Sequence, residues 1–126
     1  MTMNVFILLA MIFLHIIDDY KLQGILASMK QNKWWREQKE YKDLYKNDYI
    51  MALVEHSFSW TFMIMLPIAS TLHFNIGWWL IAYILNMVIH AFVDDLKANK
   101  FKINLVTDQL IHLTQIFITW LVFIMR

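Results

Sequence analysis

Residues 76–93 read IGWWLIAYILNMVIHAFV, and this almost unbroken apolar stretch decides the fold class of the chain. A helix that crosses a bilayer needs about 20 predominantly apolar residues. Three more stretches have this character, at residues 3–17, 50–72 and 103–125. We therefore expect an all-α fold, an integral membrane four-helix bundle whose spans lie at about residues 3–22, 50–72, 76–96 and 103–125 of a single domain.

The composition excludes several other classes of protein. The chain has 126 residues, room for one domain, and 60% of them are hydrophobic, whereas about 45–50% is usual for a soluble domain. The absence of Cys excludes disulfides, thiol catalysis and Cys-ligated metals. A net charge of +1 offers no field that would attract nucleic acid, so the expected partner is the lipid bilayer. Residues 1–17 lack the basic start and the cleavage site of a signal peptide.

The basic residues gather in two of the three connections between the spans. Residues 28–48 carry six Lys and Arg and residues 96–102 carry three, whereas residues 73–77 carry none. The positive-inside rule then places both basic connections in the cytoplasm and both termini outside. The 28–48 segment also carries four acidic residues, so it reads either as a basic amphipathic arm on the inner membrane surface or as a solvated helical hairpin.

Ionisable side chains inside a bilayer are costly and mark functional sites. Three of the four expected spans carry a His and an Asp four residues apart, a spacing that puts both side chains on one face of a helix. The remaining span adds one further His, and the expected orientation brings all these groups into the cytoplasmic half of the bilayer. The sequence thus predicts a metal site with these ligands: His15, Asp19, His56, His90, Asp94, Asp108 and His112.

One or two divalent ions would offset the three carboxylates of this layer. Imidazole and carboxylate ligands suit zinc, manganese or iron. A single His-x-x-x-Asp pair is more often only a hydrogen bond that satisfies a buried histidine, and a proton path through the same residues is a further alternative. Asp18 and Asp95 lie about 100° around the helix from the favoured carboxylates, so we expect them at the membrane interface.

Three strings of this sequence resemble the motifs of a small bacterial and phage integral-membrane family of unknown function. The strings are HIIDDYKLQ at residues 15–23, HAFVDDLK at 90–97 and DQLIHL at 108–113, with His56 between them. The resemblance extends over nearly the whole chain. It implies four membrane helices, a polar site and location in a bacterial inner membrane, which would be that of the host for a phage protein. It implies no settled activity.

Two classes of function remain open. One is a metal-dependent hydrolase that attacks a membrane-associated ester or phosphoester, such as a lipid or polyprenyl-linked substrate, at the cytoplasmic side. The candidate catalytic residues are Asp108, Lys97 and Gln109: a free Asp or Glu55 would act as general base, and Lys97 and Gln109 would contact a phosphate or orient water. The other is a non-enzymatic accessory protein that binds a host membrane protein through the basic arm. Ion conduction ranks last, because four helices form a pore only as a homo-oligomer.

Overall fold

The computed structural model describes residues 2–38, 43–70 and 74–125. Every regular element in these ranges is helical, which confirms the all-α prediction for this part of the chain. The elements are α1 (Met3–Ile17), η1 (Asp18–Leu22), α2 (Leu26–Met29), α3 (Asn32–Arg36), η2 (Asp43–Tyr45), α4 (Asp48–Met65), η3 (Pro67–Ser70), α5 (Ile76–Ala98) and α6 (Leu105–Ile124).

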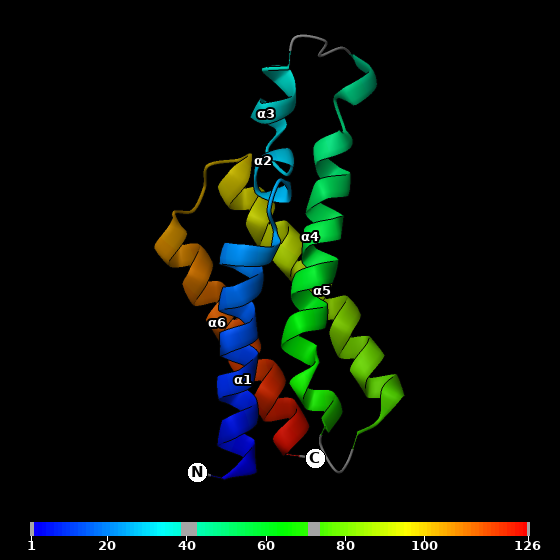
Figure 1. Ribbon diagram of the computed structural model, residues 1–126, viewed down its shortest axis with the longest axis vertical. Coiled ribbons are helices and arrows are strands. Elements are labelled where there is room, and N and C mark those ends of the chain that lie inside the picture. The colour runs from blue at the N-terminus through cyan, green and yellow to red at the C-terminus, as the bar shows by residue number, and fades with distance from the viewer. Residues whose placement is uncertain (1, 39–42, 71–73, 126) are drawn as a thin grey trace.

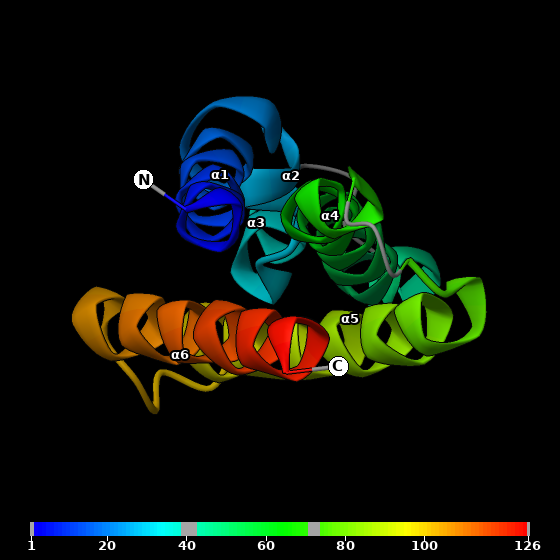
Figure 2. The same ribbon diagram turned by 90° about the horizontal axis from the view of Figure 1, so that it is seen from below.

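The four long helices form two layers. α1 and α4 run along the long axis of the molecule, and α5 and α6 cross behind them at an angle (Figure 1). The view from one end shows α5 and α6 as a separate layer that covers α1 and α4 (Figure 2). Both termini lie at one end of the molecule, and the short helices α2 and α3 lie toward the other end (Figure 1).

Three segments of the described chain are long and apolar enough to cross a membrane, judged by length and composition: Asp43–Ser70, Ile76–Ala98 and Leu105–Ile124. The first of them combines α4 with η2 and η3. α1 is shorter, with 15 residues, and reaches the predicted span of 3–22 only together with η1. Large apolar side chains point outward from the helices, and Phe13, Ile84 and Ile118 are each more than half exposed. Such a surface is suited to lipid.

Local chemistry explains where the long helices begin and end. The side chains of Asn75 and Asn104 accept hydrogen bonds from backbone N–H groups at the starts of α5 and α6, at 3.1 and 2.9 Å. These N-caps satisfy donors that a helix start leaves free. α4 stops before Pro67, whose ring nitrogen has no hydrogen to continue the helix.

The inner faces of three helices follow the helical period. On α4 the buried residues recur every four positions, at 52, 56, 60 and 64; on α5 they include positions 83, 86, 90 and 94, and on α6 positions 108, 112, 116 and 119. Each stripe is polar toward the end of the molecule that carries α2 and α3. Toward the termini the stripes pack with α1 into an apolar core that includes Met11, Ile64 and Ile116.

The segment after the first helix differs from the prediction. The sequence favours an amphipathic continuation of the first helix toward Met29, but Gly24 has a φ of +51° and breaks it. This left-handed conformation is open to glycine at little steric cost. The predicted arm at 28–48 is not one helix either, since α2, α3 and η2 are short and Gln31 is extended. α2 and α3 both contact α4.

Candidate metal centre

All seven predicted metal ligands lie buried where η1, α1, α4, α5 and α6 meet. Their exposed fractions do not exceed 8% for any residue of this set: His15, Asp19, His56, His90, Asp94, Asp108 and His112. We call this set, together with the groups that contact it, the His/Asp cluster. Four separate segments contribute to it, so the i, i+4 spacing on single helices does translate into one shared polar layer.

His90 lies at the centre of the cluster. Its Nε2 is 3.2 Å from Nε2 of His56, and its Nδ1 is 3.2 Å from Nδ1 of His112. Two groups among the described residues each bring three ligand atoms within 4.8 Å of one another: Asp19, His56 and His90, and His90, Asp94 and His112. Either group could hold a metal ion, and His90 belongs to both.

Two carboxylates bracket His56 and complete these groups. Nε2 of His56 is 3.3 Å from Oδ1 of Asp19 and 3.5 Å from Oδ2 of Asp94. The other oxygen of Asp94 is 3.3 Å from Nε2 of His112. Imidazole nitrogens and carboxylate oxygens thus line one small volume. This donor set suits zinc, iron or manganese.

Trp60 forms the floor of the cluster on the side of the apolar core. Its ring stacks on His90 with 4.0 Å between the ring centroids and 14° between the planes. Its indole N–H donates to Nδ1 of His15 at 2.7 Å. Trp60 follows His56 by four residues, so the helical spacing on α4 was a signal for it that the sequence reading missed.

His15 and Gln109 are joined by hydrogen bonds rather than placed among the close ligand atoms. Since Nδ1 of His15 accepts from Trp60, its Nε2 carries the proton and donates to Oε1 of Gln109 at 3.1 Å. The Gln109 amide nitrogen donates in turn to Asp19 at 3.1 Å and to Asp108 at 3.2 Å. His15 and Asp108 belong to neither close group. In this arrangement His15 and Asp108 would orient the neighbouring ligand side chains rather than bind the metal themselves.

Asp18 is part of the cluster, so the prediction of an interfacial position is wrong. Its side chain is fully buried, accepts from the Ser59 hydroxyl at 2.6 Å and lies 3.7 Å from Nδ1 of His56. The reason is η1, a π-helical turn closed by a hydrogen bond from the N–H of Gln23 to the carbonyl of Asp18. The wider turn directs both Asp18 and Asp19 inward, and such turns recur at functional sites.

Two lysines close the cluster on the side away from the core. Lys30, only 6% exposed, places its Nζ 2.5 Å from Oδ2 of Asp94. Lys97 places its Nζ 2.5 Å from Oδ2 of Asp108 and keeps 27% of its side chain exposed. The sequence singled out Lys97 but not Lys30, because Lys30 was one of six basic residues in the 28–48 segment.

Two acidic residues that the sequence singled out, Glu55 and Asp95, lie outside the cluster. Glu55 is exposed on α4, so the alternative general base named from the sequence does not face the predicted ligands. Asp95 pairs with Lys100 at 3.0 Å near the end of α5.

Three buried atoms of the cluster make no hydrogen bond to the described residues: Oδ2 of Asp18, Nδ1 of His56 and Oδ1 of Asp108. Buried polar atoms are rarely left in this state, and an ion or ordered water is a common explanation. The residues present therefore fit a cation. No family model, curated protein or solved structure matches the chain.

Proposed function

We propose that the chain is an integral membrane protein with a divalent metal site, and that this site hydrolyses a membrane-associated ester or phosphoester. The observation that carries the proposal is the convergence of three imidazoles and two carboxylates in the two close groups around His90. Membrane insertion as a four-helix bundle is supported by the three candidate spans and the apolar outer surface. The basic connections would then face the cytoplasm and the termini the outside.

The charges of the cluster favour one divalent ion rather than two. Four buried carboxylates face the cluster, from Asp18, Asp19, Asp94 and Asp108, and two of them pair with lysines. The four carboxylates and the two lysine ammonium groups together carry a formal charge of −2, which a single divalent ion would neutralise. A second divalent ion would leave an excess of positive charge in a buried layer, which is costly.

The positions of these residues favour a separate role for each of them in hydrolysis. A divalent ion held by the two close groups would polarise a water molecule and the substrate oxygen. Asp108 could accept the proton of the attacking water through Oδ1, which lies 3.3 Å from Nε2 of His112 but accepts no hydrogen bond from the described residues. Lys97 is the partly exposed cation of the cluster edge, and it could stabilise negative charge on a phosphoester or a departing oxygen. Gln109 would position His15 and Asp19.

Elemental analysis of the purified protein tests the metal site. We expect one equivalent of zinc, manganese or iron in the wild type and a loss in Asp94→Asn. Asp95→Asn is the matched control, because it removes the neighbouring carboxylate outside the cluster and should keep the metal. Circular dichroism shows whether each variant folds, and His90→Gln is the second variant should Asp94→Asn not fold. A folded wild type without metal, or full metal in both site variants, would refute the site.

Turnover is measured on the same proteins with a phosphatidate and an ester lipid in mixed vesicles. We expect hydrolysis by the wild type and by Asp95→Asn. Chelation of the metal should abolish this hydrolysis, and adding the metal back should restore it. Asp94→Asn should be inactive. A metal-loaded wild type that turns over none of these lipids would contradict hydrolysis of this substrate class and leave the metal site standing.

A second candidate function is favoured by one observation. His56, His90 and His112 are fully buried, and enclosed metal sites are typically structural. In that case the protein would act by binding a host membrane protein through the basic residues of the arm. Reversing the exposed charges of Lys33 and Arg36 would then abolish function, whereas loss of the metal would lower stability only. A hydrolase would show the opposite pattern.

A further inference from the structure

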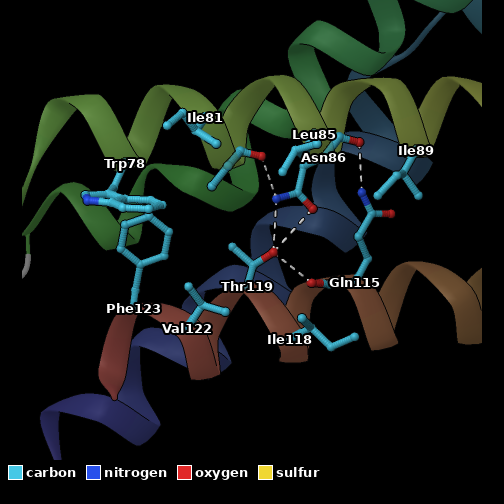
Figure 3. A pocket seen from close by; sticks show the side chains of 11 residues that line it. Trp78, Ile81, Leu85, Asn86, Ile89, Gln115, Ile118, Thr119, Val122 and Phe123 are labelled. Atoms are coloured by element: carbon cyan, nitrogen blue, oxygen red, sulfur yellow. Dashed lines mark hydrogen bonds between the residues drawn. The ribbon is translucent and has the colours of Figure 1, made fainter. Parts of the chain in front are cut away.

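A hollow of about 270 Å³ lies between α5 and α6. Figure 3 shows it with Trp78 and Phe123 at one end and Ile89 at the other. Its walls are apolar side chains that are half exposed, among them Ile81 and Leu85 of α5. No residue of the His/Asp cluster lines it.

The base of the hollow is polar, and it joins the two helices. Asn86 and Thr119 exchange hydrogen bonds at 3.0 and 3.3 Å, and the Gln115 side chain donates to the carbonyl oxygen of Asn86 at 2.8 Å (Figure 3). The amide oxygen of Gln115 is buried and has no hydrogen-bond partner among the described residues. These hydrogen bonds join α5 and α6 at the base of the hollow. The apolar side chains of its walls therefore remain available to a ligand.

A second hollow of about 380 Å³ continues the first along the same pair of helices. The two share Ile89, Gln115 and Ile118, and the second extends to Thr107 in the first turn of α6. From Trp78 to Ile89 the first hollow alone follows α5 for about 16 Å at 1.5 Å per residue. Together the two hollows form a groove. It begins near the end of the molecule that carries both termini and runs toward the basic connection between α5 and α6.

We infer that this groove binds one acyl chain of a membrane phospholipid, with the headgroup at the Thr107 end. The connection next to that end carries Lys102, whose ammonium group suits a phosphate headgroup, whereas Lys100 pairs with Asp95. The apolar length and the outward opening suit a flexible hydrocarbon chain. The inference rests on the membrane insertion proposed above and is independent of the metal chemistry.

The side chains at the edge of the groove favour a lipid chain over a second copy of the protein. Ile81, Leu85, Ile118 and Val122 are 50–58% exposed and stand beside the hollow. Helices that pack against each other in membranes prefer small residues, which let the backbones approach. Large branched side chains keep a neighbouring helix away, whereas a single hydrocarbon chain fits between them.

Photo-cross-linking tests the groove. The full chain is reconstituted in phosphatidylcholine nanodiscs with a few phosphatidylcholine molecules that carry a diazirine in one acyl chain. We expect adducts to concentrate on residues 81–89 and 115–122. Val122→Trp fills the groove and should lower their yield about tenfold, the effect of about 1.4 kcal/mol. Val88→Trp is the matched control, because Val88 is similarly exposed on α5 but lines neither hollow.

Three outcomes would overturn the inference. Adducts spread evenly over all outward apolar faces would mean surrounding lipid only. Equal losses in Val122→Trp and Val88→Trp would mean a general effect of added tryptophan. Protein–protein cross-links at Val122 that disappear in Val122→Trp would mean a second copy. Metal content measured on the same samples separates a failure of the groove from a failure of the metal site.

Discussion

At the scale of single residues, the cluster depends on side chains that link different helices. His90 contacts histidines on two other helices through its two ring nitrogens, and Trp60 both stacks on it and donates to His15. Gln109 connects His15 to two carboxylates. Because these groups are buried, the loss of one leaves its partners without hydrogen bonds, which costs about 1–3 kcal/mol for a neutral group and more for a charge.

Lys30 gives the most specific residue-scale prediction. In Lys30→Met the carboxylate of Asp94 loses its buried ammonium partner, so the metal-free protein should lose about 3–5 kcal/mol of stability. The cluster also becomes more negative, so the metal should bind more tightly and restore much of that loss. Thermal unfolding in detergent, with and without the metal, measures both effects.

Lys33→Met is the control for Lys30→Met, because the Lys33–Glu37 pair spans 3.5 Å with both side chains more than half exposed. An exposed pair of this kind contributes about 0.5 kcal/mol or less. Equal losses of stability in the two variants would contradict the role given to Lys30. So would a smaller rise in unfolding temperature on adding metal to Lys30→Met than to the wild type.

At the scale of elements, the turn between α1 and α2 brings the arm to the cluster. η1 directs Asp18 and Asp19 inward, and the chain then turns at Gly24 before α2, after which Lys30 reaches Asp94. The side chain of Asn99 donates to the carbonyl of Lys30 at 3.0 Å and accepts from the N–H of Asn32 at 2.7 Å. The start of the arm is therefore fastened to the end of α5.

Gly24→Ala tests this turn. A Cβ at Gly24 would meet its nearest atom, the Leu22 carbonyl oxygen, at 3.9 Å, so the substitution brings no clash. The left-handed conformation alone should lower stability by about 1–2 kcal/mol. Gly24→Asn should cost less, because asparagine adopts this conformation more readily. Chemical denaturation measures both, and an equal loss in the two variants would show that φ is not the cause.

At the scale of the whole molecule, each of the four long helices contributes at least one buried His or Asp to the polar layer. Both termini lie at one end of the molecule, and α2 and α3 lie toward the other (Figure 1). Ten of the eleven Lys and Arg residues lie within residues 21–46 and 97–102 of the sequence. The distribution of charge and the chain topology therefore favour the same insertion, with the arm inside.

The lack of cysteine makes this insertion directly measurable. Thr2→Cys and Lys46→Cys each introduce a single thiol, one at each end of the molecule. In bacterial cells, an impermeant maleimide should label Thr2→Cys from outside and reach Lys46→Cys only after the inner membrane is opened. Labelling in the reverse pattern would invert the proposed topology, and labelling of both in intact cells would argue against a spanning protein.

Much of this architecture could be predicted from the sequence because it depends on periodicity. The apolar stretches identify the long helices, and the His and Asp spacing identifies the cluster residues that they share. Asp18 could not be placed, because a π turn has no clear sequence signature and an ideal helix would turn this residue away. Lys30 could not be distinguished from the other basic residues of the arm, because its contact with Asp94 depends on the conformation of Gly24.

The fastening of the arm by Lys30 and Asn99 has a thermodynamic consequence. The ammonium group of Lys30 belongs to the arm and also contacts Asp94 in the cluster. Release of the arm from α5 would therefore also change the charge around Asp94. Linkage between two binding events is reciprocal: a partner that captures the released arm would change the affinity for the metal by the same factor as the metal changes the affinity for that partner. Under the proposed insertion, a contact of the arm at the membrane surface would thereby change the occupancy of a metal site within the bilayer.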